Sequence, residues 1–163
     1  MKKFFSAAIA AILALLLISC AASNYKTYVK VSYLSEKIKS ALPLSSGYAE
    51  HGADYLTYRF EDIDEHIDGY SIIYSKDTRY ADLVAVFRAR SEGDAREVCK
   101  ICEDFIEDQR ALFSGLAEQY MPSEKEKLDG AASRRFGRYV IVCVLAPSAR
   151  EKAFSTVEAE LAK

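Results

Sequence analysis

Proline, glycine and histidine are all scarce in this chain of 163 residues, which has three, seven and two of them. So little proline and glycine excludes a collagen-like or low-complexity sequence. The glycines form no phosphate-binding loop, and no Gly-x-Ser-x-Gly nucleophile elbow occurs. The two histidines, His51 and His66, lie in the least regular part of the sequence and have no obvious orienting partner. Nucleophilic catalysis therefore has little support.

The charge of the chain is balanced rather than basic. There are 22 Lys and Arg against 24 Asp and Glu, a formal net charge of −2. The broad basic surface that nucleic-acid binding needs is therefore not expected. A charged fraction of 28%, together with eleven tyrosines and eight phenylalanines, excludes a disordered chain. The length is that of a single domain.

The N-terminus carries an apolar run that predicts export. Fourteen of the fifteen residues from 4 to 18 are apolar, and they follow two lysines. A helix needs about 20 apolar residues to cross a bilayer, so this shorter run predicts a secretory signal. It ends in Leu17-Ile18-Ser19-Cys20, which resembles the lipobox of bacterial lipoproteins. The small Ser19 lets the peptide bond before Cys20 enter a peptidase, and a thiol can form the thioether to diacylglycerol. The alternative is an uncleaved anchor followed by a chance cysteine.

These features predict a lipoprotein signal peptide over residues 1–19, a lipidated N-terminus and tether over 20–27, and one globular domain over 28–163. Cleavage before Cys20 leaves 163 − 19 = 144 residues, with 22 − 2 = 20 Lys and Arg against 24 Asp and Glu, a charge of −4. Two acyl chains anchor a protein stably. We therefore expect it on the extracytoplasmic face of the cell membrane, held there by the lipid on Cys20.

The first half of the predicted domain is only partly regular. Apolar residues recur at helical spacing over 28–42, and Pro43 ends the pattern. Residues 43–54 predict a loop, and the ambiguous stretch 55–69 predicts a short helical turn. Two strands are expected next as a hairpin, over 70–74 and 83–90.

A long amphipathic helix is the strongest local prediction. Ser91 and Asp94 form the pattern of a capping box, and apolar residues then recur every three or four positions. We expect the helix to run from about Glu92 to Gln119 across the sheet and to end before Pro122. Four of its side chains are expected to be buried: Val98, Phe105, Phe113 and Leu116.

The C-terminal part predicts a second hairpin and a last helix. A short turn is expected over 122–128, strands over 131–136 and 138–145 around Gly137, and a helix from Pro147 to Lys163. Tyr139–Leu145 is apolar on both alternating faces, which predicts a central strand. The element order predicts an α+β fold. We expect a single domain with a mostly antiparallel sheet of about four strands, packed by the long amphipathic helix plus N- and C-terminal helices.

Several stretches of this domain resemble the bacterial lipoproteins that carry domain of unknown function 4358. They are LVAVFRAR (83–90), the acid-and-alanine start of the long helix, DFIEDQR (104–110), YMPSEKEKL (120–128), FGRYVIVCVL (136–145) and the acidic stretch ending in Asp68-Gly69-Tyr70. With the lipobox, the resemblance covers most of the mature chain. It implies a secreted, lipid-anchored domain with no assigned activity, and it supplies no functional residues.

The pair Cys99 and Cys102 has the C-x-x-C spacing of thiol-redox proteins. In those proteins the pair begins a helix, whose dipole lowers the thiol pKa. Here it falls about two turns inside the predicted helix, on the apolar stripe, so we expect buried, reduced and unreactive thiols. A zinc site needs four ligands. Cys143, on a strand that the long helix would cover, brings the number to only three, and no histidine follows at suitable spacing. No metal or cofactor is expected.

Two groups of polar residues are weighed as binding surfaces. Four carboxylates lie on adjacent turns of the long helix, but a helix rarely offers the six to eight oxygens that calcium needs. We favour a solvated face for these four residues: Glu103, Asp104, Glu107 and Asp108. Tyrosine joins an apolar ring to a polar tip and is common in recognition surfaces. Four tyrosines are candidates for such a surface, although we favour coverage of a half-exposed sheet: Tyr58, Tyr70, Tyr74 and Tyr80.

Arginines around the second hairpin offer a further surface. Arg134, Arg135 and Arg138 could contact phospholipid headgroups or anionic wall polymers. A strand directs alternate side chains to opposite faces, so Arg134 and Arg135 would not share one patch.

Two classes of function therefore remain open. The first is a non-enzymatic, lipid-anchored binding or interaction module of the bacterial cell envelope, with an envelope protein or a wall polymer as its partner. The second is an envelope thiol-redox protein or other enzyme that uses Cys99 and Cys102. The position of this pair inside a helix favours the first class.

Overall fold

The computed structural model describes residues 24–44, 46–77, 79–120 and 122–163, without the side chains of 114–120. The predicted signal peptide and Cys20 lie outside the described residues. The elements follow in the order α2 (Val31–Ala41), β1 (Tyr48–His51), α3 (Ala53–Arg59), the 3₁₀ helix η2 (Ile63–Glu65), β2 (Ile67–Ser75), β3 (Leu83–Ala89), α4 (Asp94–Tyr120), α5 (Pro122–Asp129), β4 (Ala132–Phe136), β5 (Tyr139–Val144) and α6 (Pro147–Leu161). The predicted α+β class is confirmed.

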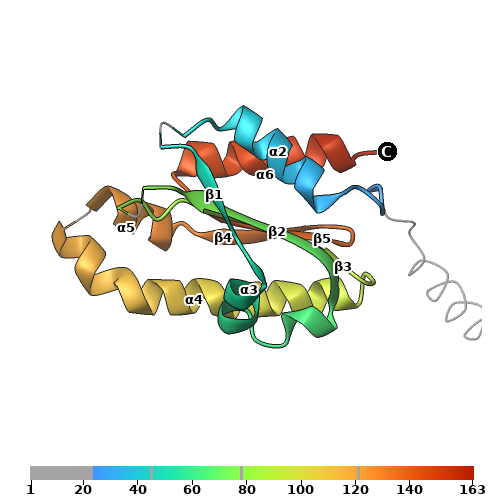
Figure 1. Ribbon diagram of the computed structural model, residues 1–163, viewed down its shortest axis with the longest axis horizontal. Helices are drawn as coiled ribbons and strands as arrows, with labels where there is room; N and C mark the ends of the chain where they lie inside the picture. Colours follow the sequence, from blue (N-terminus) through green and yellow to red (C-terminus); the bar gives the residue numbers. More distant parts are fainter. Residues whose placement is uncertain (1–23, 45, 78, 121) are drawn as a thin grey trace, which may run out of the picture.

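The five strands form one antiparallel sheet in the order β1-β2-β3-β5-β4 (Figure 1). The two hairpins, β2–β3 and β4–β5, are those that the sequence predicts. The prediction of about four strands missed β1, which lies inside the expected loop 43–54 and pairs with the end of β2, Tyr48 opposite Ser75. Four residues at the sheet edge are too few to show an alternating pattern.

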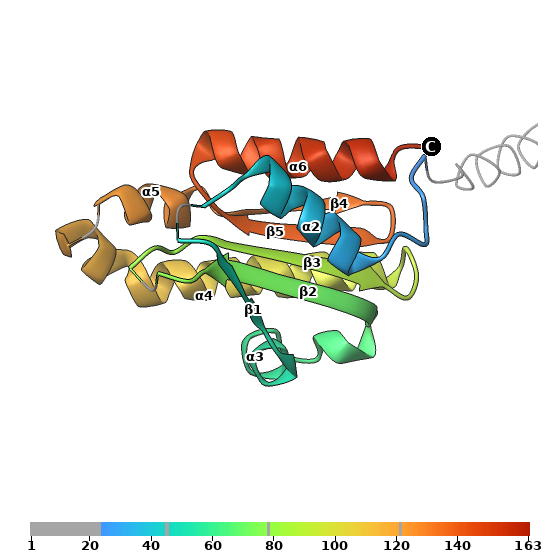
Figure 2. The same ribbon diagram turned by 45° about the horizontal axis from the view of Figure 1, so that its top comes forward.

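Alternate side chains of the inner strands fill two separate cores. In β3, Ala85 and Phe87 belong to the core on the α4 side, whereas Val84 and Val86 belong to the core on the side of α2 and α6. All six residues of β5 are buried, which confirms the prediction of a strand covered on both faces. In Figures 1 and 2, α2 and α6 lie side by side over one face of the sheet, and α4 crosses the other.

The capping residues at the start of α4 differ in one detail from the predicted box. The Ser91 hydroxyl oxygen accepts a hydrogen bond from the Asp94 N–H at 3.0 Å, as expected. The Asp94 carboxylate, however, accepts a hydrogen bond of 2.6 Å from the Ser91 hydroxyl instead of reaching the Ser91 backbone. The serine side chain therefore both satisfies a free N–H of the first turn and orients the acid.

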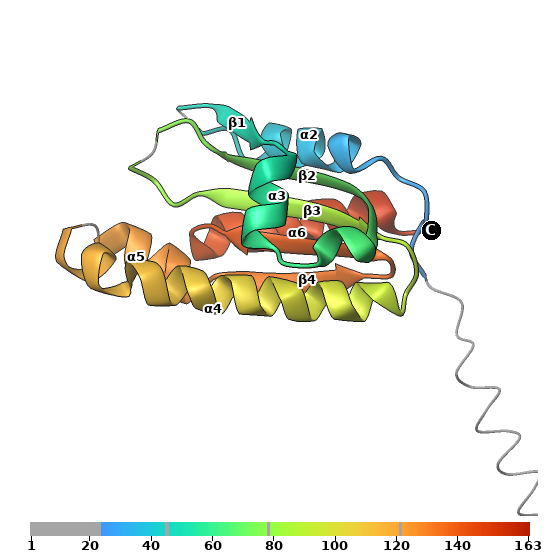
Figure 3. The same cartoon turned by 60° about the horizontal axis from the view of Figure 1, so that its bottom comes forward.

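The burial of α4 follows the prediction only in its first half. Val98 and Phe105 are buried as expected, but Phe113 is 43% exposed. The expectation for Phe113 is wrong because α4 continues past the ends of the strands, where no sheet remains to cover it (Figure 3). The side chain of Leu116 lies outside the described residues. Of the helices in the described ranges, none combines the length and apolarity needed to span a bilayer.

Helix α5 takes the place of the short turn expected over 122–128, and a buried charged network fastens it to the sheet. Lys127 Nζ lies 2.9 Å from a carboxylate oxygen of Asp82 and 3.1 Å from one of Glu124. Glu124 in turn accepts a hydrogen bond of 2.7 Å from the Ala81 N–H. Because Asp82 precedes β3, this network ties α5 to the turn between β2 and β3.

The second hairpin and the last helix form as the sequence predicts. Phe136 pairs with Tyr139, so Gly137 takes the first central position of a two-residue turn. Its φ of 60° is the left-handed value that such hairpin turns require and that glycine adopts without steric cost. Pro147 occupies the first turn of α6.

Residues 24–29, here termed the N-terminal strap, are bonded to the end of α6. The Lys26 N–H donates to the Leu161 carbonyl at 2.7 Å, and the Lys163 N–H donates to the Asn24 carbonyl at 3.2 Å. The described part of the expected tether is therefore part of the folded domain.

Candidate functional site

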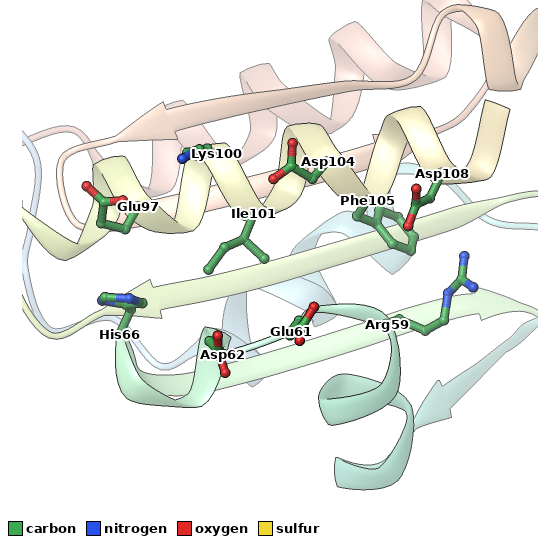
Figure 4. A pocket seen from close by; sticks show the side chains of 10 residues that line it. All are labelled: Arg59, Glu61, Asp62, His66, Glu97, Lys100, Ile101, Asp104, Phe105 and Asp108. Carbon is green, nitrogen blue, oxygen red and sulfur yellow. The ribbon is translucent and has the colours of Figure 1, made fainter. Parts of the chain in front are cut away.

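A cleft of about 370 Å³ lies between α4 and the segment formed by α3 and η2. Figure 4 shows two facing rows of side chains, one from each side. We term it the acidic cleft, and its lining residues are Arg59, Glu61, Asp62, His66, Glu97, Lys100, Ile101, Asp104, Phe105 and Asp108.

Buried aromatic contacts hold the α3–η2 side of the cleft in place. Phe60, 1% exposed, stacks on Phe105 of α4 with ring centroids 4.3 Å apart and meets Phe87 of β3 edge-on at 5.1 Å. Ile63, the first residue of η2, is fully buried. Between these two anchors the chain turns at Asp62, whose φ of 60° makes it the one non-glycine residue with positive φ in the described ranges. Aspartate is among the few residues that tolerate this conformation, and the turn places its side chain at the cleft.

The α4 side of the cleft is a single helix face. Its lining residues fall at positions 97, 100, 101, 104, 105 and 108, the three- and four-residue steps that stack side chains along a helix. The four helix acids of the sequence analysis are therefore divided. Asp104 and Asp108 line the cleft, whereas Glu103 and Glu107 are exposed elsewhere, Glu107 with an ion pair of 2.8 Å to Arg110.

Negative charge dominates the cleft. Five carboxylates line it, against the two permanent cations Arg59 and Lys100. In the described part of the chain, no ion pair joins any of the five to a cation. The guanidinium of Arg59 lies instead over the ring of Phe105, 5.5 Å from its centroid. Unpaired carboxylates above an apolar floor of Phe105 and Ile101 attract a ligand that joins positive charge to an aliphatic or aromatic stem.

His66 has an orienting partner that the sequence did not reveal. Its Nδ1 lies 3.0 Å from Asp94 Oδ1, at the start of α4. The hydrogen bonds from Ser91 and His66 together lower the pKa of the Asp94 carboxyl. The β2–β3 register could have predicted this contact, because it brings His66 beside Arg90, shortly before α4. The Arg90 N–H donates to the His66 carbonyl at 2.9 Å. The imidazole is thus held at one end of the cleft.

His51 is also partnered, in a stack of three rings. Its imidazole is parallel to Tyr55 at 3.6 Å and to Tyr74 at 3.9 Å between centroids. Two rings so close to one imidazole must lie on opposite faces of it. Burial lowers the pKa of His51, which favours the neutral ring. The stack joins β1, α3 and β2 at the sheet edge.

The four candidate tyrosines do not share one surface. Tyr70 and Tyr74 of β2 are half-buried against the core on the α4 side. Tyr58 is 82% exposed on α3. Tyr80 lies in the turn after β2, where Lys127 Nζ is 5.2 Å from its ring centroid. The tyrosine surface stays a prediction, and these placements divide it among three parts of the molecule.

The thiols occupy structural positions. Cys102 is fully buried and Cys99 is half-buried, both inside α4 rather than at its start. Burial raises the pKa of each of them. Helix α4 contacts β5, the strand that carries Cys143, as expected, but the Cys143 side chain packs in the core on the α2 and α6 side of the sheet. No group of three or more His, Cys, Asp or Glu in the described ranges is arranged to hold a metal ion.

The hairpin arginines separate as their alternation predicts. Arg134 lies over the ring of Phe154 in α6, 4.3 Å from its centroid. Arg135 is exposed, and its charge acts on Cys99 of α4, on the other side of the sheet. Arg138 donates to the Ala89 carbonyl at 2.7 Å, which fixes the hairpin turn to the end of β3.

Comparison with known proteins adds no relative. No family model matches the chain, and no curated protein or solved structure is significantly similar to it.

Proposed function

We propose that this chain is a lipid-anchored binding module on the extracytoplasmic face of a bacterial cell membrane, with the lipid on Cys20. Its acidic cleft binds a positively charged segment of another envelope protein. The observation that carries the binding role is the set of five carboxylates around the floor of Phe105 and Ile101, none of which forms an ion pair with a described residue.

The charge of the cleft selects among the partners that the sequence leaves open. Anionic wall polymers and nucleic acids would be repelled by these carboxylates, whereas lysine and arginine side chains would be attracted. A lysine stem can also lie along Ile101 and Phe105 while its ammonium group meets a carboxylate. The walls of the cleft are held by Phe60 and Ile63, so little reorganisation is needed on binding.

The binding test compares two double variants of the same helix. The purified lipidated protein in detergent is titrated with a fluorescent oligolysine peptide, with oligoglutamate as the negative probe. Asp104→Asn with Asp108→Asn should weaken oligolysine binding about tenfold, because two exposed charge pairs of about 0.7 kcal/mol each are lost. The control, Glu103→Gln with Glu107→Gln, removes the same charge from outside the cleft and should leave binding almost unchanged. Equal weakening by both double variants would refute a role for the cleft.

The thiol-redox alternative has less support from the geometry. A catalytic thiol of this type gains its low pKa from a helix N-terminus. Cys99 and Cys102 are instead inside α4, and burial raises the pKa of both. The membership in the family of domain of unknown function 4358 stays a prediction from the sequence resemblance.

A further inference from the structure

We infer that one end of the domain lies against the phospholipid headgroups of the membrane that holds the anchor. This membrane-facing end is formed by Tyr28, Lys30 and the β4–β5 turn with Arg135 and Gly137. The inference rests on the proposed lipid at Cys20 and adds the orientation of the domain on the membrane.

The length of chain before the strap limits how far the domain stands from the bilayer. Asn24 is already bonded to Lys163, so only residues 21–23 separate the strap from Cys20. Four peptide steps span at most about 14 Å even when fully extended. The lipid on Cys20 would therefore keep the point where the strap joins the fold next to the headgroups.

The strap cannot readily lengthen this tether, because its inner end is also fixed. The hydroxyl of Tyr139, a fully buried residue of β5, accepts a hydrogen bond from the Val29 N–H at 2.5 Å and donates one to the Val29 carbonyl at 2.8 Å. Peeling the strap from the sheet would break both bonds and leave the buried Tyr139 hydroxyl without these partners. Because both ends of the strap are bonded to the fold, the sheet is held at a short distance from the anchor.

The side chains at this end suit a headgroup surface. Tyr28 is 80% exposed, with the guanidinium of Arg138 5.6 Å from its ring centroid. Lys30 and Arg135 are exposed, and no carboxylate pairs with either one in the described ranges. Tyrosine favours the membrane interface, and exposed lysine and arginine favour anionic phosphates. The mature chain has a net charge of −4, so the tether rather than overall attraction sets this orientation.

The opposite end of the molecule would point away from the membrane. Figures 1 and 2 place the strap and the C-terminus at one end, and the last turns of α4 with α5 at the other. Leu112, 59% exposed, lies in the second half of α4, toward this far end. The two ends therefore provide a matched pair of reporter positions.

The absence of tryptophan from the chain allows single-tryptophan reporters. The lipidated full-length product of Tyr28→Trp is reconstituted in vesicles of phosphatidylglycerol and phosphatidylethanolamine that contain brominated lipid, a short-range quencher of tryptophan fluorescence. Leu112→Trp is the control. Both replaced side chains are exposed, so neither substitution disturbs the core. Vesicle flotation and the mass of the N-terminal peptide report the anchor separately.

We expect both variants to float with the vesicles, and the fluorescence to be lost for Trp at 28 but retained for Trp at 112. Flotation with no quenching at 28, or with equal quenching at both positions, would overturn the orientation while leaving the anchor intact. Failure to float, with no lipid mass on Cys20, would overturn the anchor and the orientation with it.

Discussion

Two phenylalanines of α4 allow a test of whether the apolar stripe of this helix is buried along its whole length or only in its first half. Phe105 is 2% exposed and stacks on Phe60, whereas Phe113 on the same helix is 43% exposed. Phe→Ala in a core costs about 3–5 kcal/mol. Because Phe105 borders the cleft, water can enter part of the space that it leaves, so we expect the lower part of that range, about 3–4 kcal/mol. Phe113→Ala should cost less than about 1 kcal/mol, as surface substitutions do.

The free energies of unfolding are measured by urea melts followed by far-ultraviolet circular dichroism, on a chain expressed from residue 21 so that no lipid is added. The slope of the free energy against urea should not differ between the two variants, since both unfold the same domain. A loss below 1 kcal/mol for Phe105→Ala would show that the α3–η2 segment does not pack on α4, and the cleft would lose its floor. Equal losses for both variants would show that the end of α4 is covered by a partner or by a second copy of the chain.

Three further outcomes follow from the anchor, the thiols and the charged network. Cys20→Ala should abolish lipid incorporation and normal processing, and a variant that is processed normally and stays in the membrane fraction would contradict the anchor. Maleimide at neutral pH should modify Cys99 slowly and Cys102 only after denaturation, and rapid modification of the native pair would favour the redox alternative. Burial lowers the pKa of Lys127, but its hydrogen bonds to two carboxylates outweigh that effect and leave the pKa above 10.5. Its stabilisation should be complete below pH 10.5 and disappear as the pH rises through the raised value, so the difference in unfolding free energy between wild type and Lys127→Met should shrink at alkaline pH.

The spacing of apolar residues predicted most helices and strands correctly, because a long run with one spacing is compatible with only one type of secondary structure. The stripe of α4 and the fully apolar run of β5 continue for enough residues to identify the type of each element, the burial of β5 and the burial of the first half of α4. The prediction failed where burial depends on a neighbour. Phe113 continues the helical pattern, but the strands end before it, and their length is set elsewhere in the chain.

The acidic cleft could be predicted only in part for the same reason. The carboxylates of α4 were visible in the sequence, but a solvated face and a cleft wall have the same pattern. Which of them face the cleft depends on the α3–η2 segment, whose left-handed turn at Asp62 and short helices leave no periodic signal. The contact between His66 and Asp94 could have been inferred from the β2–β3 register, because the hairpin brings the residue before β2 to the start of α4.

The width of the sheet explains why the cleft lies where it does. Five strands about 4.8 Å apart span roughly 19 Å, whereas one helix with its side chains covers about 10 Å. On one face α2 and α6 lie side by side and cover this width. On the other face α4 lies over β3, β5 and β4, and the remaining strands are covered by the short α3 and η2. The long α4 and the short α3–η2 segment leave the cleft between them on this face. Phe60 and Phe105 close its base, and charged residues line its walls. A longer helix in place of α3 and η2 would fill this space, so the short α3–η2 segment is the feature of this sequence that keeps the cleft open.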